Sequence, residues 1–183
     1  MISPGETYAS LARMPGRSTP LAALRRPLVV ALVLGVTAAI GATRHLTPAL
    51  LLSTTVCWSF VLVVQVAIAL ILIAGPARRT VGLARALDLY FAGHAPWSLW
   101  MLAAAAWAPS PLGRPFTPLL IAAAVPIVLT PRILSAFFRE VLEMDPRRAA
   151  ARTAAQQVMT WVTFVLLFGT AVQLVPRVLE WFA

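Results

Sequence analysis

Residues 48–75 form an uninterrupted stretch of twenty-eight residues without a charged side chain. As an α-helix this stretch is about 42 Å long, which exceeds the roughly 30 Å hydrocarbon core of a lipid bilayer. Its one strongly polar member is Gln65. Because a globular domain cannot cover so long an apolar helix on all sides, the stretch predicts a membrane-spanning helix.

The composition agrees with a membrane protein. Of the 183 residues, 60% are hydrophobic and 11% are charged, whereas about a quarter of the residues of a soluble domain are charged. We expect an all-α integral membrane protein, with a flexible cytoplasmic tail over residues 1–26 and one membrane domain of about five transmembrane helices over residues 27–183.

The expected spans are apolar runs that Pro, Gly and Arg separate. They cover residues 27–43, 48–75, 94–109, 118–138 and 157–175. The first run follows a basic flank, which is also typical of a cleaved signal peptide, so cleavage is the alternative to a retained span. Residues 81–92 mix apolar and charged side chains and predict a short amphipathic interfacial helix.

Individual residues predict where the helices start, bend and pack closely. Pro126 and Pro131 remove backbone donors, so we expect the fourth span to be bent or briefly unwound. Gly35 offers a small face for close helix packing. Pro48 suits a helix start, and Asp145 before Pro146 is a suitable N-cap for a helix that continues into the fifth span.

The distribution of Arg predicts the orientation. All fifteen basic residues are Arg, and the net charge is +9. With the N-terminus inside, eleven Arg fall in inner segments and three, Arg44, Arg114 and Arg177, in outer segments. By the positive-inside rule the N-terminus is therefore expected in the cytoplasm and the C-terminus outside, and the composition favours a bacterial inner membrane. Since the Arg lie in short loops between apolar runs, a nucleic-acid partner is not expected.

The candidate ligand or lipid contacts are Arg132, Gln65 and His94. Arg132 lies within an apolar run. Such a cation either marks a ligand site or extends its side chain to the cytoplasmic lipid headgroups. Gln65 is more typical of a hydrogen bond between helices than of a substrate contact, and the same holds for Gln173. His94 lies within reach of Asp88, but such a pair at a helix end is usually solvated.

No motif points to catalysis. The sequence has no Gly-rich phosphate loop, serine nucleophile elbow or paired-histidine motif. The two histidines, His45 and His94, are expected at opposite membrane faces, and the lone Cys57 lies inside an apolar run, so we expect no metal site of ordinary ligand count. We therefore expect no enzyme activity and no cofactor.

The architecture resembles the Yip family of membrane proteins over about residues 20–180. The resemblance rests on residues 89–93 ahead of the third span, on residues 137–142, and on residues 147–149 before the last span. It implies a five-span fold with a cytoplasmic N-terminal tail. The eukaryotic relatives bind small GTPases and shape vesicle membranes, while the bacterial members have no settled activity.

Two classes of function follow from the sequence. The first is a non-enzymatic scaffold or small accessory subunit of a larger membrane complex. Its partners would be other membrane protein subunits or further copies of the chain, together with the bilayer and its anionic lipids at the cytoplasmic face. The alternative is a small-molecule or lipid carrier, with an anionic-ligand site formed by Arg132 near the proline-broken fourth span.

Overall fold

The computed structural model describes residues 3–14, 20–107 and 117–181, and the regular secondary structure of these ranges is entirely helical. The expected all-α fold is thereby confirmed. The helices are α1 (Pro4–Arg13), α2 (Pro20–Thr43), α3 (Pro48–Ala77), α4 (Leu83–Ala92), α5 (Ala95–Trp107), α6 (Thr117–Ala122), α7 (Ala124–Glu140) and α8 (Pro146–Trp181).

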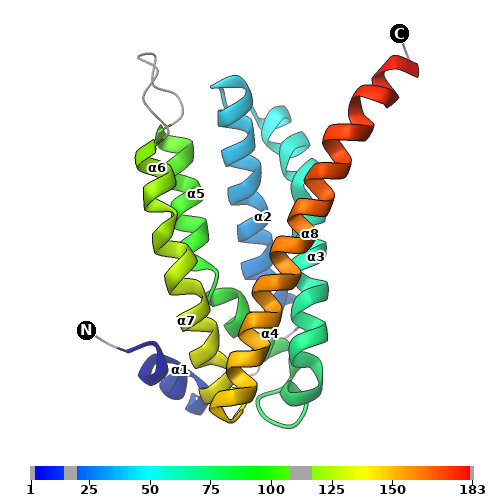
Figure 1. Cartoon of the computed structure of the whole chain (residues 1–183). Helices are drawn as coiled ribbons and strands as arrows, with labels where there is room; N and C mark the ends of the chain where they lie inside the picture. Colours follow the sequence, from blue (N-terminus) through cyan, green and yellow to red (C-terminus); the bar gives the residue numbers. More distant parts are fainter. Residues whose placement is uncertain (1–2, 15–19, 108–116, 182–183) are drawn as a thin grey trace.

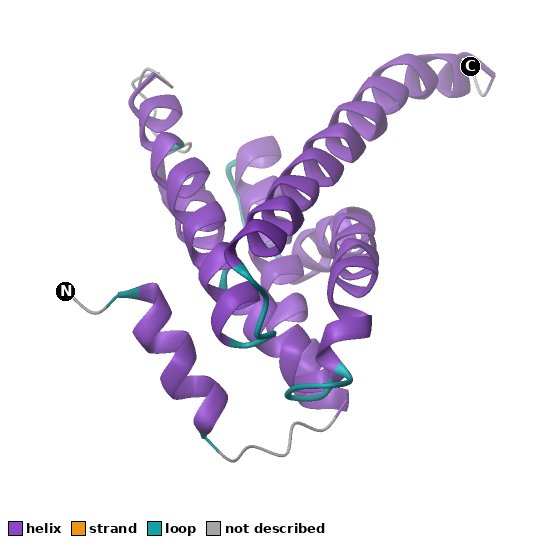
Figure 2. Cartoon of the chain, turned by 60° about the horizontal axis from the view of Figure 1, so that its bottom comes forward, coloured by secondary structure: helices purple, strands orange, loops and turns teal. Residues whose placement is uncertain are grey.

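The long helices run alternately up and down between two ends of a bundle (Figure 1). Helices α1 and α4 both lie at one end, at the bottom of the view, together with the α3–α4 and α7–α8 turns. We call this the α1–α4 end. Helix α8 starts there and extends away from the other helices towards the C-terminus (Figure 2).

Three stretches of the described residues are long and apolar enough to cross a membrane, which indicates a membrane protein. They are Ala23–Gly41, Pro48–Ala77 and Thr117–Glu140, and they match three of the five expected spans. Helix α5 has 13 residues, about 20 Å, so its described part is short for a span. The expected end of that span and the Pro-rich loop that follows, residues 108–116, lie outside the described ranges. The fifth expected span, residues 157–175, lies within α8, which begins at Pro146 as the Asp145 cap predicts.

The fourth expected span is interrupted, as the prolines predict. Helix α6 ends at Ala122 and α7 starts at Ala124, with a single turn residue, Ala123, between them. The amide of Ala123 still donates to the carbonyl oxygen of Leu119 at 2.9 Å. Since Pro126 has no amide hydrogen to donate to the preceding turn, the helical hydrogen bonding is interrupted here by one residue and then resumes.

The predicted helix start at Pro48 and the predicted cap at Asp145 are both present, and Thr47 adds a cap that was not predicted. The Thr47 hydroxyl accepts a hydrogen bond from the Leu50 amide at 3.2 Å, with Pro48 in the first turn of α3. The Asp145 carboxylate accepts one from the Arg148 amide at 3.0 Å at the start of α8. Both caps satisfy amides that have no partner inside the helix.

The N-terminal region differs from the flexible tail expected over residues 1–26. Residues 4–13 form α1, which packs on the bundle through Tyr8. The Tyr8 hydroxyl donates to the carbonyl oxygen of Leu89 at 3.1 Å, and its ring meets Phe137 edge to face at 5.8 Å between centroids. Arg85 donates to the carbonyl oxygen of Leu11. These contacts join residues 74 to 129 positions apart, so no local sequence pattern predicts them.

Helix α4 also lies deeper than the expected interfacial helix. Its residues Ala86, Leu89, Tyr90 and Phe91 are buried in the core of the α1–α4 end. Helices α1, α3, α7 and α8 and the α7–α8 turn supply the rest of this core. The amphipathic pattern of the segment therefore reflects packing against other helices as well as a polar outer surface.

Helices α2 and α3 approach each other closely at Gly35. A Cβ atom built on Gly35 would lie 2.1 Å from the Thr55 hydroxyl oxygen and 2.9 Å from the Thr55 Cα atom. The Thr54 hydroxyl, in turn, donates to the carbonyl oxygen of Gly35 at 2.9 Å. Gly35 thus permits the close helix packing that the sequence predicts.

Replacing Gly35 by alanine tests this contact. We expect G35A to destabilise the fold by about 1–3 kcal/mol, because the new methyl group forces two backbones apart. The control is G41A in the same helix, where a Cβ atom meets nothing within 4 Å. Unfolding of both variants in mixed detergent micelles gives the comparison, and equal stability of the two would contradict the close approach.

Candidate functional site

A chain of polar side chains crosses the bundle between α3 and α8. The Gln65 amide nitrogen donates to the Thr160 hydroxyl oxygen at 3.3 Å, and the Gln156 amide nitrogen donates to the same oxygen at 3.1 Å. The side-chain oxygen Oε1 of Gln156 accepts from the Gln157 amide nitrogen at 2.6 Å. The predicted interhelical role of Gln65 is confirmed, whereas the side chain of Gln173 lies outside the described residues.

Two residues near the start of α5 extend this polar chain. Tyr90 is fully buried, and its hydroxyl faces the Gln156 side chain without forming a hydrogen bond. The His94 ring lies 5.0 Å from the Tyr90 ring, and its Nδ1 atom is 3.3 Å from the Tyr90 carbonyl oxygen. We call Gln65, Tyr90, His94, Gln156 and Thr160 the polar cluster.

Three buried atoms of the polar cluster have no hydrogen-bond partner within the described ranges. They are Gln65 Oε1, the Tyr90 hydroxyl and His94 Nε2. A buried polar atom without a partner costs about 1–3 kcal/mol, so three of them in one region mark a place where a polar molecule is bound favourably. The cluster combines acceptor and donor atoms and is suited to water or a small uncharged ligand.

The Tyr90 phenol remains a donor at neutral pH. Its burial raises the pKa above the ordinary value for tyrosine, and the adjacent Gln156 side chain opposes this shift. A phenolate therefore does not form here. The residue can offer a hydrogen bond but cannot act as a base near pH 7.

The expected proximity of Asp88 and His94 does not produce a dyad. The Asp88 carboxylate pairs instead with the Arg26 guanidinium, with 2.6 Å between Nε and Oδ1. Among the described residues, no three His, Cys, Asp or Glu side chains lie together as metal ligands would.

Arg132 lies apart from the polar cluster. Its side chain is exposed, while Thr130, Leu134 and Phe137 form the buried face of α7. A displacement of two residues turns a side chain about 200° around a helix, so Arg132 points away from the core. The structure therefore brings Gln65 and His94 into one cluster and leaves Arg132 on the outer surface, also away from the helix break at Ala123.

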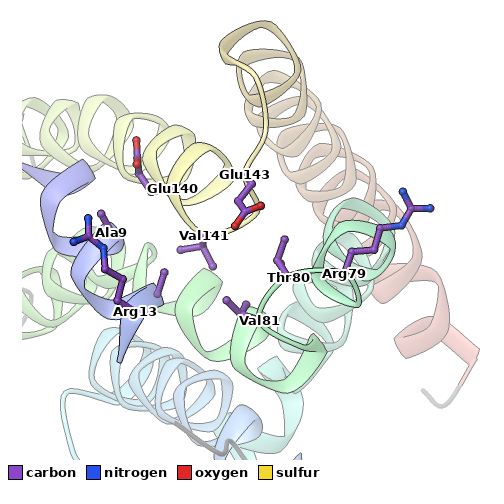
Figure 3. Close-up of a pocket in the computed structure, with 9 residues that line it drawn as sticks. Ala9, Arg13, Arg79, Thr80, Val81, Glu140, Val141 and Glu143 are labelled. Carbon is purple, nitrogen blue, oxygen red and sulfur yellow. The ribbon is translucent and has the colours of Figure 1, made fainter. Parts of the chain in front are cut away.

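A second polar feature is a pocket of about 470 Å³ at the α1–α4 end (Figure 3). Residues from α1, from the α3–α4 turn and from the α7–α8 turn line it. They are Ala9, Ala12, Arg13, Arg79, Thr80, Val81, Glu140, Val141 and Glu143. Because α1 supplies part of the lining, the pocket forms only when α1 is docked on the bundle. No single stretch of sequence therefore predicts it.

Glu143 holds a special position in this pocket. Its φ angle of 52° is in the left-handed region, which a residue with a side chain adopts at a cost of roughly 1–2 kcal/mol. Glycine usually occupies such a position after a helix. Figure 3 shows the Glu143 carboxylate turned into the hollow.

The charged side chains that line the pocket form no close ion pairs with one another in the described part of the chain. Glu140 has a loose pair with Arg139, 3.8 Å between the charged atoms. Arg13, Arg79 and Glu143 form no ion pair within the described part of the chain. These groups are therefore available to a ligand.

The chain was compared with protein families, curated proteins and solved structures. No protein-family model, curated protein or solved structure matches it. The resemblance to the Yip family accordingly stays a prediction.

Removing the Thr160 hydroxyl tests the polar cluster. We expect Thr160→Val to lower the free energy of unfolding by about 1–3 kcal/mol, because two buried amide donors lose their common acceptor. Thr163→Val is the matched control, since Thr163 lies in the same helix outside the cluster. A double mutant with Gln65→Leu should lose less than the sum of the single losses, and full additivity would contradict a shared network.

Arg132 is tested by replacing one cation with another. We expect Arg132→Lys to leave the stability in detergent micelles within about 0.5 kcal/mol of the unchanged chain, as an exposed substitution should. A larger loss would mean that the guanidinium makes a specific contact that an ammonium cannot replace.

Proposed function

We propose that this chain is a non-enzymatic integral membrane protein that acts as a scaffold or as a small accessory subunit of a larger membrane complex. The observation that carries the proposal is the course of α8. This helix packs on α7 and α3 near its start and then extends away from the bundle (Figures 1 and 2).

One face of α8 carries a continuous apolar stripe. Its side chains follow the i, i+3, i+4, i+7, i+8 spacing of a helix face and are between 48 and 69% exposed. They are Val158, Trp161, Val162, Val165 and Leu166. Gly169 continues this face, and a Cβ atom there would meet nothing within 4 Å.

Lipid covers apolar side chains as well as a protein does, so the stripe alone does not require a partner. The divergence of α8 favours one, because helices in a membrane associate through close packing and through small residues such as Gly169. A scaffold or subunit role needs such a helix and no reactive group. The partner is either another membrane protein or a second copy of this chain.

The proposed topology has five spans, with α1 and α4 at the cytoplasmic face of a bacterial inner membrane and the C-terminus outside. Its support is the position of the Arg residues. Arg13, Arg26, Arg79 and Arg139 belong to the α1–α4 end, while Arg44 lies at the opposite end between α2 and α3. This topology agrees with a Yip-like fold.

A carrier remains the second candidate function, and the three partnerless atoms of the polar cluster favour it. Such atoms would bind a small polar molecule between α3, α4 and α8. The position of Arg132 on the outer face of α7 argues against the anionic-ligand form of this hypothesis.

A photo-crosslinking amino acid in place of Val165 tests the proposed partner. In native membranes we expect this variant to form an adduct with a protein, because residue 165 is in the apolar stripe. The control carries the same amino acid in place of Ile121, an exposed residue of α6, where we expect lipid adducts.

The adduct mass, measured by mass spectrometry, identifies the partner. An adduct of twice the chain mass supports a homo-oligomeric scaffold. An adduct with the same larger protein in every preparation supports an accessory subunit. Lipid adducts alone at both positions would contradict the proposal.

A further inference from the structure

The pocket at the α1–α4 end lies where the apolar stretches of α3 and α7 end. These stretches finish at Ala77 and Glu140, and the pocket residues Arg79, Thr80, Glu140 and Glu143 lie at or just beyond their ends. In a bilayer that the two stretches cross, this is the depth of the lipid headgroups. The molecules present there at high concentration are phospholipids.

The charge pattern of the pocket complements a zwitterion. Two Arg and two Glu line it, so that its formal charge is zero while both signs are present. The Glu143 carboxylate faces the hollow, whereas Arg13 and Arg79 lie on opposite sides of it with their guanidinium groups turned outward (Figure 3). Both guanidinium groups are on exposed side chains, which can rotate over a bound phosphate.

The residues that line the pocket distinguish a choline headgroup from an ethanolamine headgroup. A quaternary ammonium such as choline is typically held by an aromatic cage, since it has no hydrogen to donate. Among the residues that the structure describes, none of those lining this pocket is aromatic. A primary ammonium, by contrast, donates hydrogen bonds to carboxylates, and Glu143 offers such an acceptor, which has no ion pair with another described residue.

We propose that this pocket binds a phosphoethanolamine group, with the ammonium at the Glu143 carboxylate and the phosphate between Arg13 and Arg79. The position of the pocket makes the headgroup of an ethanolamine phospholipid its main source. Binding joins α1 to the α3–α4 and α7–α8 turns, because each of these segments contributes one of the three charges. The inference relies on the membrane insertion included in the proposed function and on no partner protein.

Native mass spectrometry of the purified full-length chain tests the lipid. The chain is delipidated in detergent and titrated with phosphatidylethanolamine, phosphatidylcholine or phosphatidylglycerol of the same acyl chains. We expect phosphatidylethanolamine to bind about tenfold more tightly than phosphatidylcholine, the gain typical of one charge-assisted hydrogen bond. Equal retention of the three lipids would overturn the proposal.

Two substitutions test which charged side chain binds which part of the headgroup. We expect Glu143→Gln to remove the preference for phosphatidylethanolamine over phosphatidylcholine, and Arg79→Gln to weaken both lipids about tenfold. The matched control is Arg78→Gln, since the neighbouring Arg78 is exposed but does not line the pocket. The control should bind as the unchanged chain does. A preference that survives Glu143→Gln, or equal losses in the two Arg variants, would overturn the assignment.

A soluble ligand separates the two sources of the same group. Glycerophosphoethanolamine is added to the detergent-solubilised chain, and thermal unfolding is measured. Stabilisation comparable to that by the lipid identifies a headgroup-sized free ligand, whereas a preference seen only with the lipid identifies the phospholipid. The absence of both effects overturns the site, while the crosslinking result at position 165 is independent of it.

Discussion

The edge-to-face packing of aromatic rings around Phe137 holds the α1–α4 end together. Phe137 is fully buried, and its ring lies 5.8 Å from that of Tyr8, 5.9 Å from that of Tyr90 and 5.4 Å from that of Phe138. One side chain of α7 thereby fixes both α1 and α4. Between helices surrounded by lipid, the hydrophobic effect gives little attraction, so such specific packing decides which helices meet.

The polar cluster and the pocket both depend on this aromatic core. Tyr90 belongs to the core through its ring and to the polar cluster through its hydroxyl, which has no hydrogen-bond partner among the described residues. Tyr8 holds α1 in place, and α1 in turn brings Arg13 to the pocket. The same packing therefore places a buried polar site inside the bundle and a charged site at its surface.

Features with a local physical cause could be predicted from the sequence. The missing amide of Pro126, the small size of Gly35 and the cap at Asp145 act within a few residues or across one helix contact, and the structure contains their effects. Gln65 was identified because a lone amide in an apolar run needs a partner. The docking of α1 and the pocket around Glu143 could not be predicted, because they depend on contacts between distant segments. Tyr90 carried no signal beyond an amphipathic pattern.

The α7–α8 turn connects the proposed lipid pocket with α8, the helix that carries the apolar stripe. Glu143 lies three residues before Pro146, where α8 begins, and its left-handed backbone conformation sets the direction in which the chain leaves α7. A ligand that holds the Glu143 carboxylate against α1 and the α3–α4 turn restrains this backbone at the base of α8. Because α8 is 36 residues long, about 54 Å, a small rotation at its base moves its far end by many ångströms. Occupation of the pocket would therefore narrow the range of directions in which α8 presents its apolar stripe to a partner.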